Sequence, residues 1–429
     1  MRPEVQKGFV FFEEHTLANP YEFYDRVRQS GPVVRIDNPD QETYLVLDYD
    51  IIREITKRPD LFSSRPAARS LNFYPKAVAY LKEQGYGFSP QIITADPPLH
   101  TLYRKVFSQA LREKRAHQLR PRIVELAGEL IDSFVDAGRC EFVMDYAWRL
   151  AILVIAEMLG VDRNDIAQFR RWANAWVLQL EQPLSEEEML ECMKNIAELQ
   201  HYLVAALKDR VTNPQDDILT DFAAATVDQK DGSKPLSLRE VLGMCEALII
   251  AGNDTAVSAL SLGMLRLVER PEIAERIRGD RKLIANFTEE SLRYESAVQN
   301  NFRSVAEDVE FHGHKMSKGA QILLSWGAAN RDPAAFNAPD KFDIDRPGVR
   351  KHQSFGYGIH LCAGAVIARQ ELTESYGLLL DRLRNITLAD GLTSENIKRK
   401  GGIVTHGLQR LPIQFNSARR HRPRDAAGH

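Results

Sequence analysis

A helix of about thirty residues is predicted in the second half of the chain, and its composition dictates where it must lie. Ser237 and Glu240 form a capping box, in which the serine hydroxyl accepts a first-turn N–H and the glutamate reaches back. No proline follows until Pro271, so the helix would be roughly 45 Å long at 1.5 Å per residue. Its middle part, EALIIAGNDTAVSALSLGML, is apolar nearly all round, so the helix must run through the core of the protein.

Three polar residues interrupt this helix at its midpoint: Asn253, Asp254 and Thr255. Buried without partners, they would cost several kcal/mol. One interpretation is that they are satisfied core residues, with Gly252 as a packing notch. The other is that the helix bends there and its hydrogen-bond ladder opens, because a threonine hydroxyl can bond a carbonyl one turn earlier. In that case the adjacent carboxylate and hydroxyl could pass protons to something bound alongside.

Composition and charge are those of an ordinary soluble globular protein. The 429 residues are 44% hydrophobic and 27% charged, which excludes disordered, collagen-like and disulfide-scaffold classes. A net charge of −3 gives no electrostatic argument for binding nucleic acid or a membrane. The four cysteines have no CxxC spacing, which argues against zinc-ribbon and iron–sulfur proteins and fits a reducing compartment. The N-terminal apolar patch is too short for a signal peptide or anchor, so we expect a cytoplasmic protein.

The order of predicted elements indicates a mainly helical protein with a smaller β-rich portion. Segments 33–36 and 44–46 are predicted to form a hairpin. Helical periodicity runs from about 105 to 207. Residues 212–236 are polar and are predicted to be a loop, whereas a further helix is expected near 363–384.

The segment Phe355–Gly364, FGYGIHLCAG, concentrates residues that can carry chemistry. Gly356, Gly358 and Gly364 permit positive φ or close backbone approach. Cys362 precedes a predicted helix, whose first amides and dipole favour a thiolate, and a thiolate is a soft donor that suits iron. A lone buried cysteine after a turn is more often inert, but here glycines, an aromatic residue, a histidine and the cysteine stand in one ten-residue pattern. The pattern therefore predicts a stabilised thiolate.

This pattern resembles the haem-binding signature of the cytochrome P450 family, the haem-thiolate monooxygenases. AGNDT at 251–255 resembles the family's oxygen-activating helix motif. Glu290 and Arg293 match its ExxR motif, and FDIDRP, with Arg346, is similar to the segment that follows. Order and spacing resemble those of soluble bacterial members from about residue 20 to 415.

The resemblance implies the cytochrome P450 fold, with haem b between the long central helix and the cysteine-loop helix. It implies a single domain over residues 1–415, whose strands come from parts of 30–70 and 297–415. Residues 416–429 are basic and lack apolar side chains, so we expect a disordered tail.

Around the haem, the resemblance assigns residues from several segments. Cys362 would be the axial iron ligand, and Phe355 would shield its sulfur from solvent. Gly356, Gly364 and Ala251 are assigned with them to haem binding. Burying two propionates requires donors, and the family's positions for these match His100, Arg104, Arg303 and His360.

The resemblance also implies a catalytic pair and a structural charge network. Thr255 would hold an ordered water at bound O2, and Asp254 would relay protons from the surface. A second set would maintain the fold and the haem pocket: Glu290, Arg293 and Arg346. Removing one member would strand a buried charge, at roughly 3–5 kcal/mol.

The implied activity is insertion of one oxygen atom of O2 into a small hydrophobic or aromatic substrate. Two alternatives stay open: a peroxide-driven oxidase and a non-catalytic haem-thiolate ligand-binding protein. The presence of the Asp254–Thr255 pair argues against the peroxide-driven oxidase. The sequence has no flavin, nicotinamide or ferredoxin motif, so electrons would come from a separate ferredoxin and its NAD(P)H-fed reductase. Basic residues near the thiolate side would let an acidic ferredoxin dock, with scattered solvated charges as the alternative: Lys105, Arg112, Lys114, Arg115, Arg350 and Lys351.

Substrate contacts are the least specified part of the prediction. The resemblance places Val298 and Leu248 beside the substrate, and Phe73 and Phe88 in a variable lid over residues 69–93. Further aromatic residues suit a compact apolar or aromatic ligand and equally suit packing: Tyr74, Tyr80, Tyr86, Trp172 and Trp176. A polar stretch after Val298 is either a substrate anchor or a set of backbone-bonding side chains: Gln299, Asn300 and Asn301. We expect a monomer.

Overall fold

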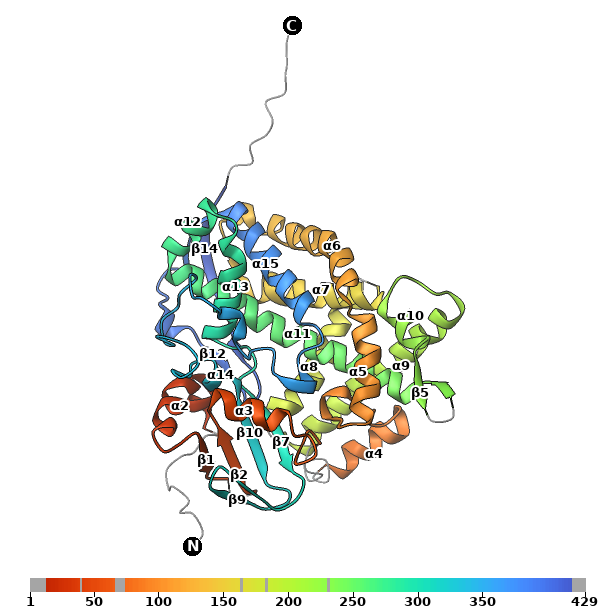
Figure 1. Ribbon diagram of the computed structural model, residues 1–429. Helices are drawn as coiled ribbons and strands as arrows, with labels where there is room; N and C mark the ends of the chain where they lie inside the picture. Colours follow the sequence, from red (N-terminus) through yellow and green to blue (C-terminus); the bar gives the residue numbers. More distant parts are fainter. Residues whose placement is uncertain are drawn as a thin grey trace.

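The computed structural model describes residues 13–38, 41–65, 74–162, 165–181, 184–229 and 232–418. Most of them lie in helices arranged around one central helix, α11 (Figure 1). The helices are α1 (Glu14–Ala18), α2 (Pro20–Arg28), α3 (Tyr49–Thr56), α4 (Pro75–Gln84), α5 (Leu99–Ala110), α6 (Glu113–Asp132), α7 (Trp148–Leu159), α8 (Ile166–Glu181), α9 (Glu186–Thr212), α10 (Ile218–Ala223), α11 (Leu238–Glu269), α12 (Pro271–Gly279), α13 (Leu283–Tyr294), α14 (Trp326–Ala329) and α15 (Ala365–Arg382).

The strands form a smaller part, and the main sheet lies at the lower left of the view in Figure 1. They are β1 (Val33–Ile36), β2 (Thr43–Val46), β3 (Phe62–Ser63), β4 (Arg139–Glu141), β5 (Thr226–Gln229), β6 (Gly232–Pro235), β7 (Asn300–Val305), β8 (Val309–Phe311), β9 (His314–Met316), β10 (Gln321–Ser325), β11 (Leu383–Leu388), β12 (Arg399–Gly401), β13 (His406–Leu408) and β14 (Pro412–Ser417). The main sheet has the order β1-β2-β10-β7-β3, in which only β2 and β10 are parallel. Strands β11, β14 and β4 form a second sheet, and β5–β6, β8–β9 and β12–β13 are hairpins. The predicted fold class is confirmed.

Helix α11 begins where the capping box predicted. Ser237 N–H donates to Glu240 Oε2 at 2.8 Å, and Glu240 N–H donates to Ser237 Oγ at 3.4 Å. By length and hydropathy this helix could cross a membrane, but 67% of its apolar stretch is buried inside the protein. It is therefore the core helix that its all-round apolar surface predicted.

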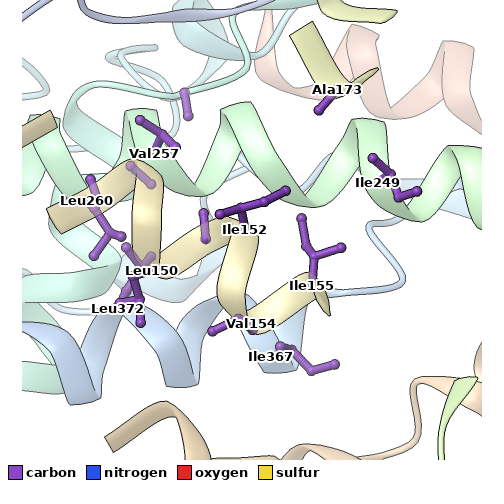
Figure 2. Close-up of a cluster of buried hydrophobic side chains, with 14 of the residues drawn as sticks. Leu150, Ile152, Val154, Ile155, Ala173, Ile249, Val257, Leu260, Ile367 and Leu372 are labelled. Atoms are coloured by element: carbon purple, nitrogen blue, oxygen red, sulfur yellow. The ribbon is translucent and has the colours of Figure 1, made fainter. Parts of the chain in front are cut away.

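Packing against α11 explains the glycine at its centre. The helix runs without interruption through Gly252, so the predicted opening of the hydrogen-bond ladder is not seen. A Cβ on Gly252 would lie 3.2 Å from Ile155 Cδ1 of α7, and this close approach favours the packing-notch interpretation. Figure 2 shows α11 contributing Ile249, Val257 and Leu260 to an apolar cluster whose other labelled members come mainly from α7 and α15: Leu150, Ile152, Val154, Ile155, Ile367 and Leu372.

Three boundaries differ from the sequence-based expectation. The stretch 212–236 is not one loop, since it contains α10 and the β5–β6 hairpin. Strands β4, β5 and β6 lie outside the two ranges expected to supply strands. Regular structure continues past residue 415, because β14 extends to Ser417 and Ala418 N–H donates to Arg382 O at 2.8 Å. Residues 419–429 of the expected tail lie outside the described part of the chain.

Candidate active site

A tight loop before α15 positions Cys362. Gly356 and Gly358 both have φ of +74°, a conformation that favours glycine. A side chain on Gly358 would lie 2.8 Å from Thr56 O of α3, so only glycine lets the loop approach that helix. Cys362 N–H donates to Phe355 O at 2.9 Å and closes the loop.

The Cys362 thiol is accessible to solvent yet densely surrounded by protein atoms. This combination is expected of a side chain that faces an internal space. Burial raises the pKa of the thiol, whereas the Gly364 N–H and the charges of Arg104 and Arg369 act in the opposite direction. Ala251 is likewise accessible, although it lies at the middle of the buried helix α11.

Phe355 is held by a charge cluster that the sequence analysis did not identify. The guanidinium carbon of Arg369 lies 4.4 Å from the centre of the Phe355 ring. Arg369 Nε donates to Glu289 Oε1 at 2.6 Å, and His352 Nε2 lies 2.9 Å from Glu289 Oε2. Burial would raise the pKa of Glu289, but His352 and Arg369 outweigh it and lower that pKa to about 2. The adjacency of Glu289 to the ExxR glutamate was the only available signal.

The four predicted donors lie together in one cationic cluster, in which His100 and Arg303 are buried and Arg104 and His360 are half-buried. The rings of His100 and His360 lie 4.2 Å apart, and Ser64 Oγ lies 2.9 Å from His360 Nε2. Arg104 donates to Leu361 O, and Arg303 donates to Phe302 O at 2.7 Å. Because Ser64 is contributed by a distant part of the chain, its role was not predicted.

Among the described residues, Asp96 is the one carboxylate whose charge acts on His100 and Arg303. Burial lowers the pKa of Arg303 to about 10. Burial and the charges of Arg303, His100 and Arg104 lower the pKa of His360 to about 3. His100 is 2% exposed, and its Nε2 has no hydrogen-bond partner among the described residues. The nearest carboxylate, Asp96, is already bound by Ser63 Oγ at 2.5 Å and by the Ser64 N–H at 2.8 Å. The arrangement is suited to an anionic ligand with several acceptor oxygens.

The predicted charge network is present and buried. Arg293 donates to Glu290 through Nε at 2.7 Å and Nη2 at 2.8 Å, and neither side chain is exposed. Arg346 Nε donates to the same carboxylate at 3.1 Å and 3.2 Å. Their remaining guanidinium N–H groups donate to backbone carbonyls of residues 330–341. The network therefore ties α13 to the segment that leads toward the cysteine loop.

The polar centre of α11 has a partner from a distant strand. Thr255 Oγ1 donates to Ala251 O at 2.7 Å, the back-bond expected of a helical threonine. Lys400 Nζ of β12 donates to Asp254 Oδ1 at 2.7 Å. Asp254 Oδ2 and Asn253 Oδ1 are buried, and within the described residues neither has a hydrogen-bond partner.

The residues predicted to contact the substrate differ in how deeply they are buried. Val298 and Phe88 are half-buried, Leu248 is buried, and Phe73 lies outside the described residues. Trp172 and Trp176 are core residues, and Trp172 Nε1 donates to Glu198 Oε2 at 3.2 Å.

The polar stretch after Val298 bonds within the protein. Gln299 donates to Ser296 O at 2.8 Å, Asn300 donates to Ile403 O at 2.7 Å, and Asn301 Oδ1 accepts from Trp326 Nε1 at 2.8 Å. These contacts match the backbone-bonding interpretation more closely than the substrate-anchor interpretation.

The prediction that Arg115 helps to dock a ferredoxin is wrong. Arg115 is 7% exposed and is paired with Asp221 at 2.7 Å, so it cannot face a partner. The other five are exposed: Lys105, Arg112, Lys114, Arg350 and Lys351.

Comparisons with known proteins agree with this geometry. The family model described as cytochrome P450 matches residues 163–409. Cytochrome P450 144 of Mycobacterium tuberculosis is 33% identical over 383 residues, which cover 89% of this chain and 86% of that protein. The cytochrome P450 monooxygenase PikC of Streptomyces venezuelae is 32% identical over 406 residues, with coverage of 94% and 92%.

Solved structures give the same result. Myxobacterial cytochrome P450 CYP267B1, in complex with myristic acid, has a TM-score of 0.84 and 30% identity, and the match covers 95% of this chain and 98% of that one. P450BioI, in complex with an acyl carrier protein ligated with hexadec-9Z-enoic acid, has a TM-score of 0.83 and 29% identity, with coverage of 94% and 100%. The similarity extends over nearly the whole chain in each case.

Proposed function

The chain belongs to the cytochrome P450 family, whose members are haem-thiolate enzymes with haem b, and from this we propose how its residues serve a monooxygenase. Cys362 is the thiolate ligand of the iron, and Phe355, Gly356 and Gly364 surround the sulfur. Ala251 of α11 and the loop that leads into α15 would hold the haem between them. Bound there, the haem supplies the activation of O2 and the transfer of one oxygen atom to substrate.

The observation that carries this assignment is the unbalanced cationic cluster. A haem presents two propionates, which offer the acceptor oxygens that the cluster lacks. Arg303 is 8% exposed and has no carboxylate within ion-pair distance in the described part of the chain, and His100 Nε2 has no partner. Two carboxylates placed against His100, Arg104, Arg303 and His360 would satisfy these groups and restore charge balance. The residues present therefore fit the group.

The polar centre of α11 handles protons. Thr255 uses its hydroxyl hydrogen in the bond to Ala251 O, so its oxygen is left to accept from a water molecule. Asp254 keeps one oxygen, Oδ2, without a protein partner in the described residues, and this oxygen can take up a proton and release it to that water. The pair thus holds and moves protons at the oxygen-binding side.

The substrate that we propose is a small hydrophobic or aromatic molecule. Myristic acid in one solved relative and the hexadec-9Z-enoic acid on the acyl carrier protein in another both have a long apolar chain. In this proposal Val298, Phe88 and Leu248 would supply the apolar surface that contacts the substrate, and Phe73 belongs to the same predicted set. The polar residues after Val298 are already bonded within the protein, so they leave little for a polar substrate.

Electrons come from a separate ferredoxin and an NAD(P)H-fed reductase in this proposal. The exposed basic residues Lys105, Arg112, Lys114, Arg350 and Lys351 would attract an acidic ferredoxin. We further propose that the chain acts in the cytoplasm as a monomer with one catalytic domain, which extends through Ser417.

Reduction under carbon monoxide tests the assignment directly. Wild-type protein should give the red-shifted absorption band of a thiolate-ligated haem, and Cys362→His should give an imidazole-type band or lose the haem. Turnover then separates the functions: a monooxygenase consumes NAD(P)H and O2 with a surrogate ferredoxin, a peroxide-driven enzyme needs only peroxide, and a ligand-binding protein forms no product. An imidazole-type spectrum in the wild type would overturn the proposal.

A further inference from the structure

Asp254 is tied to a residue 146 positions away. Lys400 Nζ lies 2.7 Å from Asp254 Oδ1, and the two side chains are 32% and 18% exposed. The ion pair occupies only one carboxylate oxygen. The other, Oδ2, is buried and has no partner within the described ranges. Leaving such an acceptor empty costs about 1–3 kcal/mol, so the arrangement favours a hydrogen-bond donor at Oδ2.

The strand that carries Lys400 is held on both sides. A Cβ on Gly401 would lie 2.4 Å from Ala18 N of α1, so β12 runs directly against that backbone. A Cβ on Gly407 would lie 2.4 Å from Ser258 Oγ, one turn beyond Asp254, so β13 runs directly against α11. Arg399 adds an ion pair to buried Glu295. The backbone at Lys400 therefore has little freedom to move.

The same hairpin reaches the proposed substrate-contact segment. Val298 is paired with Thr405, and Gln299 N–H donates to Val404 O at 2.8 Å. His406 N–H donates to Ala297 O at 2.9 Å. The residues between β12 and β13 thus lie beside Val298, whereas β12 itself carries the cation that binds Asp254. One hairpin contacts both the substrate side and the proton-handling side of the site.

We propose that Lys400 is a positioning residue for proton delivery, which anchors Asp254 by Oδ1 and keeps Oδ2 turned toward the interior. Oδ2 takes up one proton from solvent-connected water and releases it to the water held by Thr255, so the carboxylate returns to its starting state. The Lys400 ammonium keeps its own protons throughout. This inference rests on the proposed function, because it assigns a partner to the acid of that site.

The test compares four variants of the haem-loaded protein: Lys400→Met, Lys400→Arg, Lys398→Met and Asp254→Asn. Lys398 is an exposed neighbour in the same segment, so its replacement by methionine is a matched control. Each variant is reduced by a surrogate ferredoxin in air, with myristic acid as the probe and again without added substrate. The readouts are peroxide formed per NAD(P)H oxidised, the solvent deuterium isotope effect on the oxidation rate, and the carbon monoxide spectrum.

Lys400→Met should raise the peroxide share and the solvent isotope effect, and slow oxidation by roughly threefold or more, since the acid is misplaced rather than lost. Its carbon monoxide spectrum should stay that of the wild type. Lys400→Arg should restore the wild-type values, because a guanidinium can also hold Oδ1. Lys398→Met should not differ from the wild type.

Three sets of results would overturn different claims. If Lys400→Met matches Lys398→Met while Asp254→Asn is impaired, the positioning role of Lys400 is wrong and the proposed function stands. If Lys400→Arg is as impaired as Lys400→Met, the ion pair does not act by holding Oδ1. If the wild type lacks the thiolate spectrum, or Asp254→Asn behaves as the wild type does, the proposed site itself is wrong.

Discussion

Arg293 and Glu290 form a two-point ion pair, with distances of 2.7 Å and 2.8 Å, in which neither side chain is exposed to solvent. Because the carboxylate is buried, Arg293→Ala removes its two strongest hydrogen bonds and leaves Arg346 as its remaining cationic partner. We expect this variant to lose about 3–5 kcal/mol of unfolding free energy, or to fail to fold. Urea unfolding followed by circular dichroism measures the loss.

The exposed pair of Arg276 and Asp345 provides the control for that measurement. Its distance of 2.8 Å resembles that of the buried pair, but the side chains are 47% and 56% exposed. Solvent screens such pairs, so Arg276→Ala should leave the unfolding midpoint nearly unchanged. Equal destabilisation by the two alanine variants would contradict the importance of burial.

Arg303 should control how long the haem stays bound. In Arg303→Gln a buried charged donor to the propionates is lost, and we expect haem to dissociate roughly tenfold faster or more. Transfer of haem to an excess of apomyoglobin, followed by absorbance, gives the rate. Arg410→Gln removes an exposed arginine from another surface and should leave the rate unchanged. Equal rates in both variants would remove Arg303 from the propionate site.

Thr255→Ala should keep haem and ligand binding but divert electrons to peroxide. The variant loses the hydroxyl oxygen that holds the water molecule. Protons from Asp254 then have no fixed water through which to reach the oxygen-binding side. Peroxide formed per NAD(P)H oxidised is the measurement. Thr255→Ser retains the hydroxyl and should stay close to the wild type. Undiminished coupling of electron use to product in the alanine variant would eliminate the role of Thr255.

Glu246 should make the protein less stable at alkaline pH. Its side chain has no exposed surface, and burial raises its pKa from 4.5 to about 7 despite hydrogen bonds from Gln200 and Gln91. The folded protein therefore binds more protons than the unfolded chain between these two values, and stability falls as pH rises through that window. Glu246→Gln should match the wild type near pH 5 and exceed it near pH 8 by up to about 3 kcal/mol.

Denaturant unfolding at these two pH values measures the effect of Glu246. Gln200 Nε2 donates to Glu246 Oε1 at 2.8 Å, a contact that a glutamine oxygen can also accept. The substitution should therefore leave the packing between α9 and α11 intact. A wild-type protein whose stability does not fall between pH 5 and pH 8 would refute the prediction.

Two helical glycines should respond in opposite ways to alanine. A Cβ on Gly263 of α11 would lie 2.0 Å from the Tyr376 hydroxyl, which itself donates to Ala259 O at 2.9 Å. Gly263→Ala should therefore destabilise the protein by about 1–3 kcal/mol through overpacking. Gly128 of α6 has nothing within 4 Å of such an atom, so Gly128→Ala should stabilise by about 0.5–1 kcal/mol. Thermal unfolding of both variants tests the pair.

Short sequence patterns correctly predicted the helices and strands whose formation depends on neighbouring residues. The capping box at Ser237 gave the start of α11, and the β-branched run at 33–36 gave β1. The helix expected near 363–384 is α15, which begins two residues later and ends two residues earlier. Where polar residues mask periodicity, as in 212–236, a short helix and a hairpin were missed because tertiary contacts stabilise them.

The site was predictable only where a motif carries its residues. Cys362, Glu290 and Thr255 stand inside recognisable patterns, and the structure places the propionate candidates His100 and His360 side by side. Lys400 was missed because its pairing with Asp254 joins segments 146 residues apart, and no spacing rule covers that separation. Arg369 and Glu289 were missed for the same reason, since their pairing depends on how α13 packs against α15.

The cationic cluster draws on α5, on β7 and on the cysteine loop, which are far apart in the chain. A nascent polypeptide that has left the ribosome only as far as β7 has His100 and Arg303 but still lacks His360 and the sulfur at 362. Such a truncated chain has three of the four propionate candidates and lacks the sulfur ligand for the iron. Loading with haem must therefore be a late event in biogenesis, which follows synthesis of nearly the entire polypeptide.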